Sequence, residues 1–287
     1  MTTIHLKAAM PALPPTPPPI FNMPTPTASE SAILRLAARL GLNTRQGGGR
    51  VAHDDKTFSY SHGPIDLTLH RASGAFRFAN RNTWQVDHRS NVELSDEEAV
   101  RIARTHLESL DLLPRESKVQ RVSRLHVAAA GPERVMLDHR VIDVAVHLQP
   151  VVRGLPVDGP GGTVTVYLDH EKSVTCVDYR SRRVGAIHRQ TTRLLTPEHA
   201  LDSARRSWEA RGIAEVEVNE VRLCYYEMGC EDRQRYLQPA YLVLATLIGA
   251  DRRIRTGDIY VSPAAANAVG RIVTPPPRPS AQTRRAA

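Results

Sequence analysis

Apolar and polar residues alternate with a period of two through the middle of the chain, which is typical of β-strands with one buried face. Between residues 163 and 169, apolar side chains occupy every second position, with polar residues or tyrosine between them. A polar turn follows, and residues 174–179 predict the partner strand, with Val174 and Cys176 on one face. The pattern therefore predicts a β-meander over residues 148–179.

Two other segments carry apolar residues at the three- and four-residue spacing of an amphipathic helix. The first begins after Ser95 and the second after Thr196, and each hydroxyl is placed to cap its helix. Their predicted ranges are residues 95–112 and 197–211. The apolar stripe of the first helix includes His106, and its position there indicates a core residue rather than a catalytic base.

The two predicted helices belong to a longer repeat. Residues 94–104 align without a gap on residues 195–205. Leu-Gln-Pro also begins an apolar, β-rich run downstream of each helix, at residues 148–150 and 237–239. This duplication indicates tandem modules of one α+β type. We expect each module to be an antiparallel sheet that cradles one helix.

The remaining segments are assigned around these modules. Eight prolines lie in the first 30 residues, and they favour an extended segment over a helix or a strand ladder. Alternating runs between residues 56 and 87 predict an extra antiparallel β region, after a short helix near residues 31–40. In chain order, we expect a disordered Pro-rich arm over 1–30, a first α+β module over 31–190, a second over 191–273, and a disordered Pro/Arg tail over 274–287.

Composition and charge limit the functional classes to which the protein could belong. The net charge of the 287-residue chain is +8, and this surplus is spread too thinly to mark a nucleic-acid interface by itself. We find no apolar run long enough for a membrane span or for the core of a signal peptide, so a cytoplasmic location is expected. Cys224 and Cys230 could pair across a turn; free thiols are the alternative.

The histidines and the candidate nucleophiles carry no recognisable catalytic motif. None of the 12 histidines lies in a metal-binding motif, and no serine stands in a nucleophile elbow. His147 is expected to point into the core, where one hydrogen bond would satisfy it. The sequence therefore predicts no catalytic residue, no metal site and no cofactor.

Two short clusters are candidates for a binding surface. The densest basic cluster inside the folded part lies between the modules and consists of Arg180, Arg182 and Arg183. It could dock an acidic partner or a phosphate, and a solvated linker explains it as well. The second cluster, at the end of a predicted strand, consists of Tyr225, Tyr226 and Met228. These side chains suit a binding surface, with core packing as the alternative.

The local sequences of the helix starts and of the meander resemble those of a known superfamily. Both helix starts fit Leu-[Ser/Thr]-x-Glu-x-Ala-x-x-x-Ala-Arg, and the meander contains Val-Arg-Gly-Leu-Pro-Val at residues 152–157 and Thr-Val-Thr-Val-Tyr-Leu-Asp at 163–169. Over roughly residues 93–262 the chain resembles the PepSY and thermolysin-type propeptide (FTP-like) superfamily. The resemblance implies curved antiparallel sheets cradling one helix, used as inhibitory or chaperoning propeptides of peptidases or as binding modules. The sequence shows no export signal and no peptidase segment, so a propeptide role in cis is not expected.

Three functions follow as hypotheses. The leading one is a non-enzymatic binding or regulatory protein with a protein partner, a separately encoded peptidase or another enzyme. The alternative is an enzyme whose site assembles from scattered histidines and carboxylates. The third is weak nucleic-acid binding through arginines on one surface. A deep pocket that gathers ionisable side chains would favour the enzyme, whereas a shallow exposed sheet would favour the binding protein.

Overall fold

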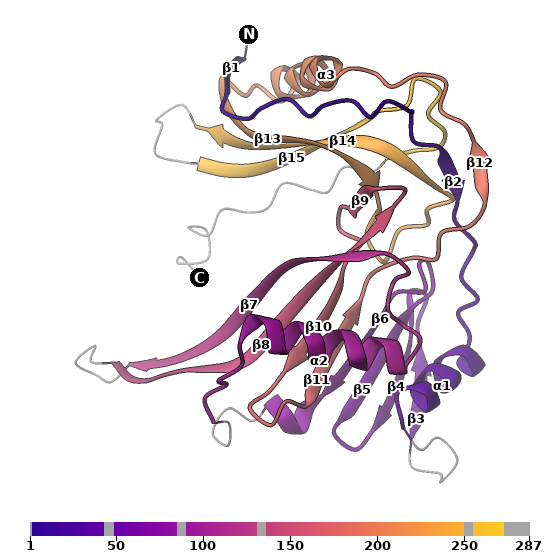
Figure 1. The fold of residues 1–287 in the computed structure, drawn as a ribbon, viewed down its shortest axis with the longest axis vertical. Coiled ribbons are helices and arrows are strands. Elements are labelled where there is room, and N and C mark those ends of the chain that lie inside the picture. The colour runs from indigo at the N-terminus through magenta and orange to yellow at the C-terminus, as the bar shows by residue number, and fades with distance from the viewer. Residues whose placement is uncertain (1, 43–48, 85–89, 131–135, 250–254, 273–287) are drawn as a thin grey trace.

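The computed structural model of the protein describes residues 2–42, 49–84, 90–130, 136–249 and 255–272 (Figure 1). Three α-helices and one 3-10 helix lie in these ranges: α1 (Glu30–Arg39), η1 (Arg81–Trp84), α2 (Asp96–Ser109) and α3 (Pro197–Ala210). The strands are β1 (Thr3–Leu6), β2 (Ile20–Asn22), β3 (Arg50–His53), β4 (Thr57–His62), β5 (Ile65–His70), β6 (Phe76–Asn80), β7 (Ser117–Ala130), β8 (Met136–Val152), β9 (Leu155–Asp158), β10 (Val164–Leu168), β11 (Val174–Tyr179), β12 (Ile187–Arg189), β13 (Glu215–Tyr226), β14 (Tyr236–Ile248) and β15 (Arg255–Pro263).

The helix predictions are confirmed, including the short helix near residues 31–40. The hydroxyl of Ser95 accepts a hydrogen bond from the backbone N–H of Glu98, and Thr196 caps α3 through His199 in the same way. Each cap satisfies one of the backbone donors that a helix start leaves unpaired, which explains why these boundaries could be read from the sequence.

The first half of the sheet is antiparallel and runs in the order β7, β8, β10, β11, β6, β5, β4, β3. The small β region expected between residues 56 and 87 is part of this sheet, because β6 pairs with β11. Helices α1 and α2 pack on one face of it, as Figure 1 shows in front of the lower sheet. The core between them contains Leu107 of α2 and Val146 and Val166 of the sheet, all fully buried.

The second half is built on β13, β14 and β15, with α3 packed against β14 and β15. Trp208 of α3 is fully buried there, and its indole Nε1–H donates to Asp258 Oδ2 at 2.7 Å. The apolar body of the tryptophan fills the core while a strand carboxylate satisfies its single polar group. The positions of α3 and β15 are therefore coupled by packing and by one buried hydrogen bond.

The prediction of two separate modules, each an antiparallel sheet cradling one helix, is wrong. All 15 strands belong to one mixed sheet, because β9 pairs antiparallel with β8 and parallel with β13. Figure 1 shows β9 between the upper and lower parts of the molecule. The sequence repeat did not reveal this joint, since the pairing of β9 with β13 joins strands that lie far apart in the chain.

The prediction of a disordered arm over residues 1–30 is also wrong. β1 pairs in parallel with β13, β2 pairs with β14 and β12, and Ile20 is fully buried. Six of the eight prolines lie between these short strands and two follow β2, so no ladder hydrogen bond is required of them. The carbonyl of Pro18 accepts a hydrogen bond from the Thr191 hydroxyl. The expected tail over 274–287 lies outside the described residues.

None of the helices in the described ranges is long and apolar enough to cross a membrane.

Candidate functional site

The structure brings Arg182 and Met228 together, but inside the molecule. The carbonyl of Met228 accepts a hydrogen bond from Arg182 Nη1 at 2.7 Å, and both residues are buried. Tyr225 and Tyr226 follow each other on β13, so their side chains enter two different hydrophobic clusters on opposite faces. The exposed members of the predicted clusters are Arg180 and Arg183.

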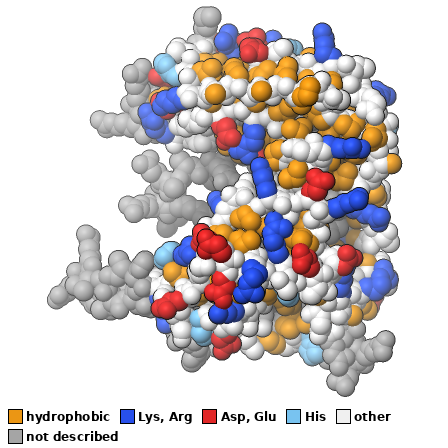
Figure 2. Space-filling view, viewed as in Figure 1, with side chains coloured by type: hydrophobic (Ala, Val, Ile, Leu, Met, Phe, Trp, Pro, Cys, Tyr) orange, Lys and Arg blue, Asp and Glu red, His pale blue; other side chains and the backbone are white. Residues whose placement is uncertain are grey.

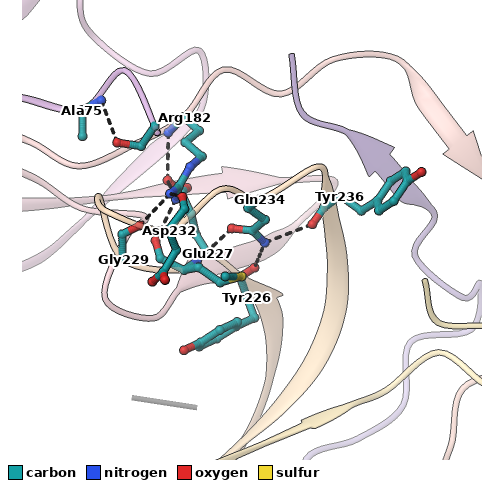
Figure 3. Close-up of polar contacts among 10 residues, drawn as sticks. Ala75, Arg182, Tyr226, Glu227, Gly229, Asp232, Gln234 and Tyr236 are labelled. Atoms are coloured by element: carbon teal, nitrogen blue, oxygen red, sulfur yellow. Dashed lines mark hydrogen bonds and ion pairs between the residues drawn. The ribbon is translucent and has the colours of Figure 1, made fainter. Parts of the chain in front are cut away.

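Four residues hold Arg182: Glu227, Met228, Gly229 and Asp232. We call these five residues the junction cluster (Figure 3). The guanidinium donates to Glu227 Oε1 at 3.2 Å and to the carbonyls of Gly229 and Asp232 at 2.6 and 2.8 Å. The backbone N–H of Arg182 donates to the same Glu227 oxygen at 2.9 Å. Arg182 thus holds the first part of the loop between β13 and β14, and the Gln234 amide ties the same loop to the carbonyls of Tyr226 and Tyr236.

The junction cluster also joins the two halves of the sheet. The backbone N–H of Glu227 donates to the carbonyl of Asp158 at the end of β9, and Gly161 donates back to the Glu227 carbonyl. A side chain at Gly161 would place its Cβ only 2.5 Å from the carbonyl oxygen of Met228. Glycine is required here because the two backbones approach so closely.

Burial raises the pKa of Glu227 to about 7, and the charge and hydrogen bonds of Arg182 partly offset this rise. The Glu227 side chain is 2% exposed and that of Arg182 is 5% exposed, so a ligand cannot reach either without displacing the loop. The predicted binding role of Arg182, Tyr225, Tyr226 and Met228 is therefore not available to a partner on the surface. Their positions fit the alternative of core packing.

The opposite face of the first sheet differs from the helix-covered face in its chemistry. We call it the polar face. Neighbouring strands place these side chains in two rows across it: Arg121, His147, Thr165, Asp178 and Arg77 in one, and Ser123, Ala145, Tyr167, Cys176 and Ala79 in the other, with Asp143 beyond them on β8. Arg77 and Arg121 are exposed, while His147, Tyr167 and Asp178 are half-buried. Thr165, Asp143 and Cys176 are buried on this face. A partner can therefore reach Arg77 and Arg121, and in part the half-buried groups of the two rows.

His147 is the centre of a hydrogen-bond network on this face. Its Nε2 lies 2.9 Å from the Ser123 hydroxyl and its Nδ1 lies 3.1 Å from the Thr165 hydroxyl. Burial, and then the positive charge of Arg121, lower the pKa of His147, against a smaller opposing effect of Asp178. The imidazole is therefore neutral at pH 7, with one nitrogen donating and the other accepting.

The prediction that His147 points into the core is wrong, because its strand position faces away from the helices. The prediction that Val174 and Cys176 lie on one face of the strand is also wrong. Val174 pairs with Leu168 and packs on the helix side, but a β-bulge follows and turns Cys176 to the polar face. Burial raises the pKa of the Cys176 thiol, and the hydrogen bond from Arg77 partly offsets this effect.

The polar face lacks the geometry that an acyl-transfer site needs. Ser123 and His147 resemble a nucleophile with its base, but the backbone N–H groups around them belong to the ladders of β7, β8 and β10. They are not free to form an oxyanion hole. No group of three or more metal-ligating side chains is found within the described ranges. The arrangement is suited to holding a partner by hydrogen bonds.

The strand alternation could have identified this face from the sequence, because Thr163, Thr165 and Tyr167 stand opposite the apolar residues of β10. The order of strands across the sheet could not be read in that way. His147 and Cys176 therefore could not be placed beside these residues without the structure.

No family model matches the chain, and no curated protein matches it in sequence. Among solved structures, the crystal structure of an uncharacterized protein from Eubacterium rectale ATCC 33656 is similar, with a TM-score of 0.49 and 13% sequence identity. That alignment covers 90% of this chain and 86% of the other.

Proposed function

We propose that this protein is a non-enzymatic binding or regulatory protein that docks a polypeptide on the polar face. One observation carries the proposal: the reachable polar groups lie in rows across neighbouring strands instead of converging on one point. A catalytic site needs groups aimed at one reacting atom, whereas a docking surface needs spaced donors and acceptors on a rigid support.

The charges of the polar face favour a polypeptide as the partner. Groups of both signs lie on and beside the face: Arg77, Arg121 and Arg180 are exposed, and Asp66 and Asp178 are half-buried. Arg180 is held by Asp178 through two contacts, of 3.0 and 2.7 Å. A set of donors and acceptors of both signs suits a peptide backbone and mixed side chains better than a polyanion.

Nucleic-acid binding gains no support from the surface in Figure 2. Acidic and basic side chains are interspersed over the part in front of the lower sheet, and basic side chains form no continuous patch there. A nucleic-acid interface would require a run of positive charge to displace counterions from the phosphates.

The resemblance to thermolysin-type propeptides makes a separately encoded peptidase the first partner to test. An inhibitor of this kind lowers the peptidase rate in proportion to its occupancy. A chaperone of this kind raises the yield of folded peptidase and leaves the rate of the mature enzyme unchanged. Rate and refolding yield, measured with the purified proteins, distinguish the two roles.

Site-specific photo-crosslinking in the source cells tests the docking surface whichever protein the partner is. A benzophenone amino acid replaces Arg77 or Arg121 on the polar face, and Arg205 on α3 serves as an exposed control. We expect both face positions to crosslink one common protein that the control position does not. Crosslinks to that protein from Arg205 alone would contradict the proposal, and a substrate turnover abolished by His147→Gln in a folded protein would establish the enzyme alternative.

A further inference from the structure

A groove of about 540 Å³ runs beside α2 on the helix-covered side of the first sheet. It lies between the end of α1, the middle of α2, strand β6 and the turn from β10 to β11. Its volume falls within the range of about 300–1,000 Å³ typical of small-molecule sites. The groove is separate from the polar face, because the sheet lies between them.

The floor and the rim of the groove differ in chemistry. Phe78, Ile102 and Val174 contribute apolar side chains, and Arg101 and Lys172 contribute cations. Such a lining matches a molecule with an apolar body and an anionic end, because each part would be placed against its complement.

The two cations point to one place on the rim. Lys172 Nζ lies 2.7 Å and Arg101 Nη2 lies 3.9 Å from the same oxygen, Glu98 Oε1. Two cations against one carboxylate leave one positive charge uncompensated among the three groups. A second carboxylate can therefore join this cluster and share both cations.

His106 adds a polar group at the groove. Its Nε2 is buried, and none of the described residues gives it a hydrogen-bond partner. Burial lowers the pKa of this imidazole, so the ring is neutral at pH 7 and can present an N–H at Nε2. A buried donor without a partner is costly, and a ligand oxygen would relieve that cost.

We propose that this groove binds a free, small apolar carboxylate of the fatty-acid class, with its chain on Phe78, Ile102 and Val174 and its carboxylate near Arg101 and Lys172. The proposal is independent of the docking function, because the two surfaces lie on opposite faces of the sheet. Loss of one in a variant would leave the other unchanged.

Calorimetric titration of the full chain with dodecanoate, dodecan-1-ol and dodecyltrimethylammonium tests the proposal. We expect dodecanoate to bind most tightly, the alcohol more weakly and the ammonium least. Lys172→Gln should weaken dodecanoate binding about tenfold through the loss of one charge-assisted contact, and should leave the alcohol unaffected. Lys118→Gln is the matched control, since Lys118 is exposed on β7 outside the groove and has the same charge.

A second variant tests the place of binding. Thr105 lines the groove from the exposed side of α2, and Thr105→Trp should block both dodecanoate and the alcohol while the helix stays folded. The ring proton signals of His106 should shift when dodecanoate binds to the unmodified chain. Dodecanoate binding that Thr105→Trp leaves intact, or equal affinities in the Lys172 and Lys118 variants, would overturn the proposal.

Discussion

The junction cluster and the polar face use the same residue types, and they differ in how much hydrogen-bonding capacity the fold itself consumes. In the junction cluster the Arg182 guanidinium donates to Glu227 and to three backbone carbonyls, and its side chain is 5% exposed. On the polar face Arg77 and Arg121 are exposed. Arginine thus serves as an internal crosslink in one region and as a surface donor in the other.

This difference should separate positions that matter for stability from positions that matter little for it. A buried charge whose partners all come from the same chain contributes mainly when one member is removed, because the remaining charge is then stranded. A half-exposed charge contributes little to folding and keeps its capacity for a partner. Variants in the two regions should therefore differ strongly in their effects on stability.

The largest effect is expected from Arg182→Ala. This variant leaves Glu227 buried without its cation and leaves three carbonyls without their donor, so the free energy of unfolding should fall by about 3–5 kcal/mol. Urea denaturation monitored by circular dichroism measures the change. Arg180→Ala, which removes an exposed arginine two residues away, should cost no more than about 1 kcal/mol. Equal losses in the two variants would remove the distinction between the regions.

The pH dependence of the junction cluster sharpens the same comparison. Folding raises the pKa of Glu227 from 4.5 to about 7, so the folded state binds the proton more tightly than the unfolded state. Stability from this residue is complete below pH 4.5 and is lost as the pH rises towards 7. Glu227→Gln should flatten the stability profile in this window. An unchanged slope in urea titrations from about pH 4.5 to about 7.5 would contradict it.

The next effect concerns the N-terminal segment that packs beside the junction. Phe21 is 6% exposed, and its ring meets the ring of Tyr225 edge-on at 5.6 Å. Phe21→Ala should lower the free energy of unfolding by about 3–4 kcal/mol through the lost burial and the cavity that remains. Leu13→Ala is the control in the same segment, because Leu13 is 46% exposed. A small loss for Phe21→Ala would show that the segment is only loosely attached.

Local patterns predicted the helices well, and they predicted the joints poorly. The caps at Ser95 and Thr196 are decided within four residues, so the sequence alone carries the information. The pairing of β9 with β13 and of β1 with β13 depends on contacts between residues far apart in the chain. No local periodicity encodes such pairing, and the proline-rich composition of the first 30 residues concealed two short strands.

The candidate site shows the same limit. From the sequence, Arg182 and Met228 were candidates for a binding surface. Arg182 lies in a dense run of positive charge and Met228 follows an aromatic pair, and both features are common at interfaces. They are buried because the loop after β13 packs against the segment that follows β11. Neither local sequence indicates this contact between distant segments. The bulge that turns Cys176 to the polar face cannot be read from the sequence either, because one inserted residue reverses the alternation of faces.

A smaller effect is expected on the polar face. His147→Gln keeps one hydrogen-bonding end between the two hydroxyls, so the free energy of unfolding should change by no more than about 1 kcal/mol at pH 7.5. Folding lowers the pKa of His147 below 6.5, so the unmodified chain should lose stability as the pH falls through 6.5. The variant should lose less. A loss near that of Arg182→Ala would make the polar face a structural element like the junction.

The smallest effect, and the one of opposite sign, is expected from His106→Leu. The Nε2 of His106 is buried without a partner among the described residues, and leucine has a similar volume and no polar atom. The substitution removes a desolvated nitrogen from the edge of the helix-packing side, so stability should stay the same or rise by about 1 kcal/mol. Thermal melting at pH 5.5 and 7.5 measures it. Because burial lowers the pKa of His106, the gain should be larger at pH 5.5, where the unfolded chain binds a proton that the folded chain resists. A destabilised variant would mean that the imidazole already has a partner, and His106 would then contribute to folding as Glu227 and Arg182 do in the junction cluster.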